Sequence, residues 1–287
     1  MTIKNPRKVP PTVTGLEVFD RLVKIPPYDY EGFGNGLCRR RIRLTKSEHN
    51  RTIGELEDDF HHFRVELTHD EEKILSVEGS ILRAPWSTCS EANHPLQKII
   101  GSSLSSESTA IGGYASPTSN CTHLFDLTGL VISHTVQEQI VRQYDLMVTD
   151  PSDHKQDLLL WRDGELLLAW TVQADTIIEP PEWEGVSLQG KFIPWAITQL
   201  DPKIAEAAIA LRRMLHISSG HGINLDKLEN GAEHLDGPIG RCYTYTDEVL
   251  LRATRMKKTV RNFEREEHAS LMLADMDTRG QSQDPAN

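Results

Sequence analysis

Two stretches in the first quarter of the chain alternate charged and apolar residues, which is the pattern of a half-exposed β-strand. They cover residues 40–45 (RRIRLT) and 63–68 (FRVELT). The second stretch is followed by a polar turn, His69 to Glu72, and by a further apolar run over residues 74–82. Residues 157–172 form a second hairpin pattern, with Asp163-Gly164 between two leucine-rich runs. An Asp-Gly pair favours the positive φ angles of a tight hairpin. We therefore expect antiparallel hairpins.

Helical spacing is found in four segments. Residues 95–100 predict a short helix that stops at Gly101, and residues 127–144 predict a longer one. Asp201-Pro202 is an N-cap followed by proline at the first helical position, and apolar residues recur behind it up to Leu215. Residues 246–256 predict the last helix. Together with the hairpins, these segments indicate an α+β fold in which helices pack on an antiparallel sheet.

The two ends of the chain differ from its centre. Residues 1–37 are rich in Pro and Gly, so we expect an irregular arm with a short helix near residues 16–23. Residues 264–287 are charged and polar and predict a flexible tail. Between them, residues 38–263 are expected to form a single α+β domain.

Composition narrows the classes of function. The chain has 287 residues, and 31 Lys and Arg against 42 Asp and Glu give a net charge of −11. An acidic chain argues against a nucleic-acid partner, which normally needs a basic face, and the one basic run is residues 39–43. The sequence contains neither a secretory h-region nor an apolar run long enough to span a membrane. We expect a soluble, cytoplasmic protein with a small-molecule substrate; the sequence leaves its oligomeric state open.

Nucleotide chemistry is also not expected. No G-x-G-x-x-G follows a strand and no Walker loop is present, so the sequence predicts no nucleotide cofactor. Four cysteines without a secretory signal do not indicate a disulfide framework.

Three motifs follow one another in the first half of the chain: HHFRVELTHD from His61, RAPWSTC from Arg83 and NCTHLFDL from Asn120. In this order they resemble a bacterial family known as domain of unknown function 2889. The resemblance implies family positions at His61, Cys89, Cys121 and His123. His62 departs from the family pattern, in which many relatives carry an acidic residue. The resemblance brings no reaction with it.

Two thiols and two imidazoles, those of His61, Cys89, Cys121 and His123, are a chemically reasonable ligand set for zinc or iron. Their spacing matches no familiar metal motif. A second reading is acid–base catalysis by His61 or His123, with Asp59 or Asp126 orienting the ring, or with Cys89 or Cys121 as nucleophile. A third reading is an ordinary buried core, since free cysteines are often buried. The sequence leaves these three readings open.

Other residues have weaker signals. Trp86, His62 and Phe125 are candidate walls of a substrate pocket, and Asp58 is expected in a solvated turn. His221, between two glycines, is expected to be exposed at a loop tip. The sequence therefore favours an enzyme of small-molecule catabolism, of lyase, hydrolase or isomerase type, with a hydrophobic and possibly aromatic or terpenoid-like substrate. The alternative is a non-catalytic binding or structural protein.

Overall fold

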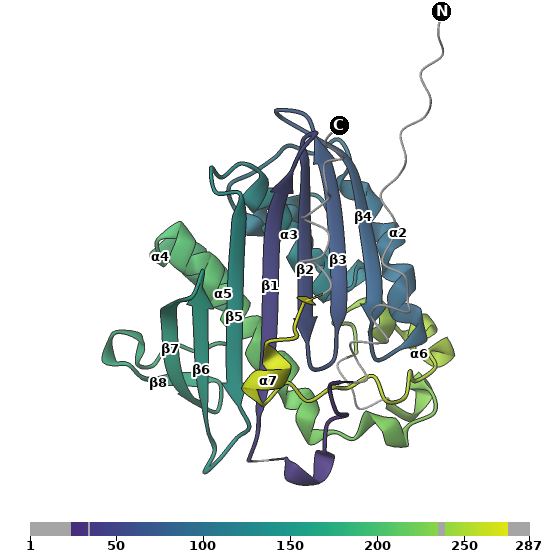
Figure 1. Ribbon diagram of the computed structural model, residues 1–287, viewed down its shortest axis with the longest axis vertical. Helices are drawn as coiled ribbons and strands as arrows, with labels where there is room; N and C mark the ends of the chain where they lie inside the picture. The colour runs from purple at the N-terminus through teal and green to yellow at the C-terminus, as the bar shows by residue number, and fades with distance from the viewer. Residues whose placement is uncertain (1–23, 34, 235–238, 275–287) are drawn as a thin grey trace, which may run out of the picture.

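One antiparallel β-sheet forms the centre of the computed structural model, which describes residues 24–33, 35–234 and 239–274. Within these ranges, eight strands pair in the order β4-β3-β2-β1-β5-β6-β7-β8 (Figure 1). Their bounds are β1 (Leu37–Ser47), β2 (Arg51–Asp58), β3 (His62–His69), β4 (Ile74–Arg83), β5 (Val141–Thr149), β6 (Lys155–Arg162), β7 (Glu165–Gln173) and β8 (Thr176–Glu179). The expected α+β class with an antiparallel sheet is confirmed.

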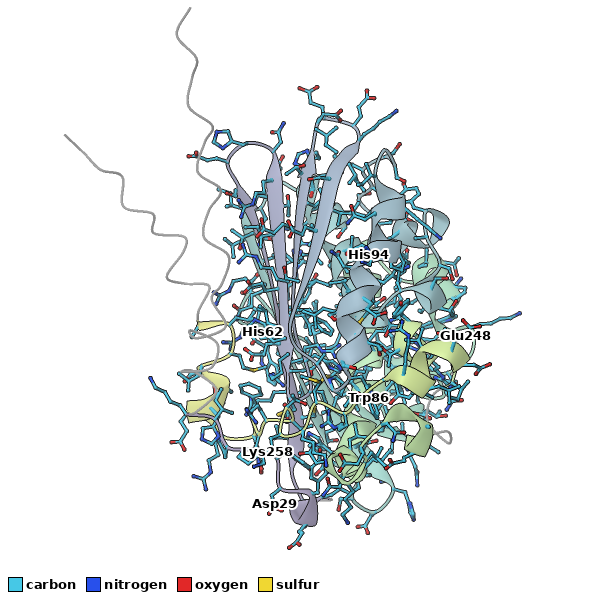
Figure 2. The ribbon with its side chains drawn as sticks, turned by 90° about the vertical axis from the view of Figure 1, so that its right-hand side faces the viewer. Asp29, His62, Trp86, His94, Glu248 and Lys258 are labelled. Atoms are coloured by element: carbon cyan, nitrogen blue, oxygen red, sulfur yellow. The ribbon has the colours of Figure 1, made fainter. Side chains whose placement is uncertain are left out.

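Two consecutive units of the same design build this sheet. Strands β1–β4 are followed by α3 (Thr122–Thr135), and strands β5–β8 are followed by α5 (Pro202–Ser218). The first strands of the two units pair antiparallel at the centre, where Ile42 lies opposite Tyr144. Helix α3 covers β1–β3 and α5 covers β5–β7 on the same face (Figures 1 and 2). The first turn of α3 and the last turn of α5 therefore meet at one end of the sheet.

The other α-helices of the described residues are short and lie around these two layers. They are α2 (Asn93–Leu96), α4 (Phe192–Gln199), α6 (Asp247–Arg252) and α7 (Glu266–Ala269). The main apolar core fills the space between the sheet and helices α3 and α5. On β1 the residues that face this core are Cys38, Arg40, Ile42 and Leu44, and they alternate with more exposed neighbours, as expected for period 2.

The hairpin predictions are confirmed, and two helix predictions need correction. Asp163 and Gly164 both have positive φ, at 54° and 87°, as a tight hairpin requires. The helix expected over residues 127–144 begins earlier, at Thr122, and ends at Thr135, while residues 141–149 form β5. The apolar residues of that last stretch alternate across a central strand, and this tertiary pairing overrides a compatible helical spacing. The helix expected over residues 246–256 is also shorter in the structure, where it is α6 and ends at Arg252.

The outer face of the sheet carries the C-terminal segment. Helix α7 lies on the side opposite α3 and α5 (Figure 2). The backbone N–H of Leu273 donates to the Glu57 carboxylate, and Phe263 and Met272 pack with Ile25 in a small second core. The tail expected over residues 264–287 is thus packed on the sheet as far as residue 274, and the helix expected over residues 16–23 lies outside the described residues. None of the helices in the described ranges has the length and apolarity to cross a membrane.

Candidate functional site

The connection between β2 and β3 builds the site. The Asp58 carboxylate accepts hydrogen bonds from the backbone N–H groups of Phe60 and His61, at 2.8 and 2.7 Å. This is the local side-chain-to-backbone pattern by which Asp stabilises a turn. From the end of β4, the Arg83 guanidinium donates hydrogen bonds to the backbone carbonyl oxygens of Asp58, Asp59 and His61. A short turn that is hydrogen-bonded on both sides holds its side chains in fixed directions.

Asp58 is a buried carboxylate that joins a guanidinium to an imidazole. Its Oδ2 accepts from Arg40 Nε at 3.0 Å and Nη2 at 2.5 Å, and its Oδ1 lies 3.0 Å from His61 Nδ1. Burial alone would raise the pKa of Asp58, but His61 and Arg40 together lower it well below its usual value. Asp58 is therefore ionised, and it holds the proton of His61 on Nδ1. The expectation that Asp58 sits in a solvated turn is wrong, since its side chain is fully buried.

His61 presents its second nitrogen as a free acceptor. Nε2 makes no hydrogen bond to any residue in the described ranges, and the residue is 7% exposed. Burial lowers the pKa of His61, and the attraction of Asp58 opposes this without reversing it. The ring lies beside those of Phe60 and Phe63, with centroids 6.0 and 5.3 Å away. A neutral, oriented imidazole with an unprotonated Nε2 is the form in which histidine accepts a proton.

The first turn of α3 brings a second imidazole to this ring. The centroids of His61 and His123 are 3.9 Å apart at an interplanar angle of 31°. Burial, followed by the charge interaction with His61, lowers the pKa of His123 well below its usual value. Its Nδ1 lies 3.8 Å from Cys121 Sγ, and its Nε2 is buried without a hydrogen-bond partner in the described ranges. His61, His123 and Cys121, which the sequence singled out, are thus neighbours in space.

The two cysteines of the motifs are protonated thiols. Cys89 Sγ lies 3.5 Å from Thr244 Oγ1, and burial raises the pKa of Cys89 to about 11. Burial also raises the pKa of Cys121 well above its usual value. The thiolate is the nucleophile and the thiol is not, so neither environment activates its cysteine.

Of the four metal ligands that the sequence suggested, only the two imidazoles and the Cys121 thiol lie close together. In the described part of the chain, the one group of three or more His, Cys, Asp and Glu ligand atoms within 4.8 Å of each other is Cys38, Asp59 and His221. Cys89 faces Thr244 instead of the paired imidazoles. A metal bound by His61, Cys89, Cys121 and His123 stays a prediction.

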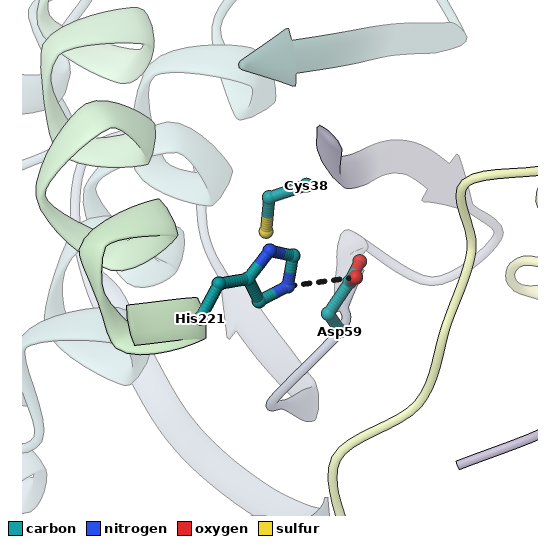
Figure 3. Close-up of side chains that lie close together, drawn as sticks. All are labelled: Cys38, Asp59 and His221. Atoms are coloured by element: carbon teal, nitrogen blue, oxygen red, sulfur yellow. Dashed lines mark hydrogen bonds and ion pairs between the residues drawn. The ribbon is translucent and has the colours of Figure 1, made fainter. Parts of the chain in front are cut away.

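Asp59, which the sequence offered beside Asp126 as a carboxylate that could orient His61 or His123, faces a different histidine. Its Oδ2 lies 3.1 Å from His221 Nε2 (Figure 3). On the other side of the ring, His221 Nδ1 lies 3.2 Å from Asp150 Oδ1. His221 is fully buried and stacks on Tyr28 at 3.9 Å, so the expectation of an exposed loop-tip histidine is wrong. The orienting role falls to Asp58. The Asp-x-x-His spacing, typical of a side chain that caps its own turn, was the signal for it.

The contacts described for the other candidate residues are not with the paired imidazoles. His62 points to the outer face of the sheet, with Nδ1 3.8 Å from the Glu57 carboxylate, whereas Trp86 lies on the helical side (Figure 2). The Trp86 indole N–H donates to the Tyr245 hydroxyl at 3.1 Å, and Phe125 is buried in α3. Asp126 forms an ion pair with Arg213 at 2.9 Å. The ring contacts of His61 are instead with Phe60, Phe63 and His123.

A comparison with known families matches a segment that contains most of this site. Residues 42–137 match a family described as "Protein of unknown function (DUF2889)". The resemblance drawn from the three motifs is therefore confirmed for about a third of the chain, since all three lie inside the match. No curated protein matches the chain.

The DUF2889 segment contains much of the site but not all of it. Asp58, His61, Cys121 and His123 lie within residues 42–137. Arg40 precedes the segment and forms the ion pair with Asp58. His221, which holds Asp59, comes from the end of α5, far beyond it. The second unit of the fold therefore contacts the turn that carries His61, through Asp59.

Proposed function

We propose that this protein is an enzyme that acts on a small molecule by acid–base chemistry, with His61 as the general base. The observation that carries the proposal is the contact of 3.0 Å between His61 Nδ1 and a buried, arginine-paired Asp58. A carboxylate at Nδ1 fixes the tautomer and leaves the Nε2 lone pair to accept a proton. Lyases, hydrolases and isomerases all use such a base.

The low pKa of His61 supports this role. A general base must be unprotonated at the working pH, and burial lowers the pKa of His61 from its usual value near 6.5. Asp58 stays ionised and stabilises the imidazolium that forms when the base takes a proton. His123, neutral and tilted by 31° against the same ring, adds no competing positive charge at neutral pH.

The surroundings of the base favour an apolar substrate. The rings of Phe60 and Phe63 lie beside His61, and this wall is what supports a hydrophobic substrate, aromatic or terpenoid-like. These two rings replace Trp86 and Phe125 as the candidate wall, because neither of the latter has a ring contact with His61.

The test compares His61→Gln with His94→Gln, an exposed histidine outside the site. Purified protein is incubated with a metabolite extract and with a panel of aromatic and isoprenoid esters, lactones and hydroxy acids, and products are identified by mass spectrometry. We expect His61→Gln to lower the rate of the wild-type reaction by about 10²–10⁴-fold, the usual contribution of a positioned base, and His94→Gln to leave it unchanged.

The pH dependence provides a second readout. The unprotonated ring is the active form, so the rate should rise with pH through a midpoint below about 6.5 and then level off. Turnover by His61→Gln within a few-fold of the wild type, or no turnover of any compound by the wild type, would favour the binding-protein alternative.

A further inference from the structure

A second cluster of ligand-type side chains lies next to the site and has no part in the acid–base proposal. Cys38 is near the start of β1, Asp59 is in the β2–β3 turn, and His221 follows the end of α5. All three are fully buried, and one ligand atom from each lies within 4.8 Å of the others (Figure 3). We call them the buried triad.

We propose that the buried triad binds one Zn²⁺ ion. Thiolate sulfur, imidazole nitrogen and carboxylate oxygen are the three donor types that zinc takes in proteins. A tetrahedral ion with bonds of about 2.0–2.3 Å holds its donors roughly 3.3–3.8 Å apart, so the triad, with its ligand atoms within 4.8 Å of one another, needs a contraction of at most about 1.5 Å.

The groups around the triad are those that accompany a bound metal. Asp150 Oδ1 lies 3.2 Å from His221 Nδ1, so it accepts the proton of that nitrogen while Nε2 faces Asp59. A carboxylate on the far nitrogen of a ligand histidine is the usual outer partner in zinc sites, because it fixes the ring and raises its basicity. The backbone N–H of Arg39 donates to Asp59 at 3.2 Å and holds that carboxylate in place.

Charge also favours a cation here. In the described part of the chain Asp59 forms no ion pair with a Lys or Arg side chain, and its charged partner is His221. Its neighbour Asp58, by contrast, is paired with Arg40. Burial, and then the charge of Asp59, raise the pKa of Cys38 to about 12, so its thiol keeps its proton while no cation is bound.

Zinc binding then replaces protons. Burial lowers the pKa of His221, but Cys38 and the hydrogen bonds to Asp150 and Asp59 raise it above its usual value, so the ring is an imidazolium before zinc binds. One Zn–S, one Zn–N and one Zn–O bond then form, the Cys38 thiol and the His221 imidazolium each release a proton to the solvent, and Asp59 binds as the carboxylate. Three protein ligands leave the fourth position of a tetrahedral ion to a water molecule, and the three ligands themselves are fully buried. The ion would tie the β2–β3 turn to β1 and to the end of α5, and so hold the loop that carries His61.

The experiment measures metal content, so it is independent of any activity. Protein purified without a metal-affinity tag from zinc-supplemented medium is analysed by plasma mass spectrometry, as wild type, Cys38→Ser and Cys242→Ser. We expect about one zinc per chain in the wild type and in Cys242→Ser, and a loss of at least tenfold in Cys38→Ser. Wild type without zinc, or zinc retained by Cys38→Ser, would overturn the proposal.

A second measurement applies if Cys38→Ser does not fold. The Cys89→Ser/Cys121→Ser variant keeps the triad intact and lacks the thiols of the other candidate set. It is stripped of metal with a chelator and then titrated with Co²⁺. A thiolate-to-cobalt charge-transfer band that saturates at one equivalent, with about two protons released, supports the triad. Absence of that band contradicts it. The acid–base proposal stands or falls separately, on the activity of His61→Gln.

Discussion

Two adjacent carboxylates in one turn take opposite roles because their side chains leave the backbone in different directions. Asp58 meets Arg40 and His61, which lower its pKa well below the usual value. Burial raises the pKa of Asp59, and the hydrogen bond from His221 opposes this without reversing it. The sequence motifs grouped His61, Cys89, Cys121 and His123 in a candidate site, and in the structure His61, His123 and Cys121 are neighbours. The motifs could not decide between Asp58 and Asp59, because the direction of a turn residue depends on backbone hydrogen bonds that no composition rule encodes.

The ion pair of Asp58 with Arg40 should also contribute to the stability of the fold. Asp58→Asn leaves the Arg40 guanidinium, 4% exposed, without its charge partner. Removing one member of a buried ion pair typically costs about 3–5 kcal/mol, and we expect that loss in the free energy of unfolding, measured with urea. Asp145→Asn is the matched control, since its pair with Arg41 is only half-buried and should change stability by less than about 1 kcal/mol. Equal effects of the two substitutions would contradict the assigned role of Asp58.

Helix α5 and helix α3 show what local signals can and cannot predict. Helix α5 begins where the sequence indicates, at Pro202 behind Asp201, whose carboxylate accepts from the Lys203 N–H. Its signals are local, as caps are. Helix α3 begins behind Cys121, which makes no side-chain cap hydrogen bond. Its true bounds are set by packing on β2 and β3, and so the sequence misplaced both of its ends.

Gly129 inside α3 allows a neighbouring segment to pack closely on the helix. A Cβ at Gly129 would lie 2.2 Å from the backbone oxygen of Ser108, so the segment 108–113 needs this glycine to pack on the helix. Helix propensity alone favours Gly129→Ala by about 1 kcal/mol, but overpacking costs about 1–3 kcal/mol, and the neighbour here is backbone. We expect a lower melting temperature for Gly129→Ala and little change for Gly112→Ala, which meets nothing within 4 Å. A stabilised Gly129→Ala would show that segment 108–113 does not pack on α3 in this way.

At the scale of the whole molecule, the repeated unit of four strands and a helix creates the site. Pairing of β1 with β5 sets Cys38 opposite Val148, near Asp150, and the antiparallel run of α3 and α5 brings His123 and His221 to the same end of the sheet. The hairpins were predictable because each is made by neighbouring residues. The repeat and the buried triad were not, since Cys38 and His221 are joined by topology across most of the chain.

The most direct test of His61 as the general base is to measure its protonation and tautomer, because this measurement needs no substrate. Long-range ¹H–¹⁵N correlation spectra of the labelled protein at pH 7 report both, and His61→Gln assigns the signal. We predict a neutral ring with its proton on Nδ1, which lies 3.0 Å from the Asp58 carboxylate, and with a lone pair on Nε2. We also predict a titration midpoint below about 6.5. An imidazolium at pH 7, or a neutral ring with its proton on Nε2, would contradict the assignment of His61 as the base.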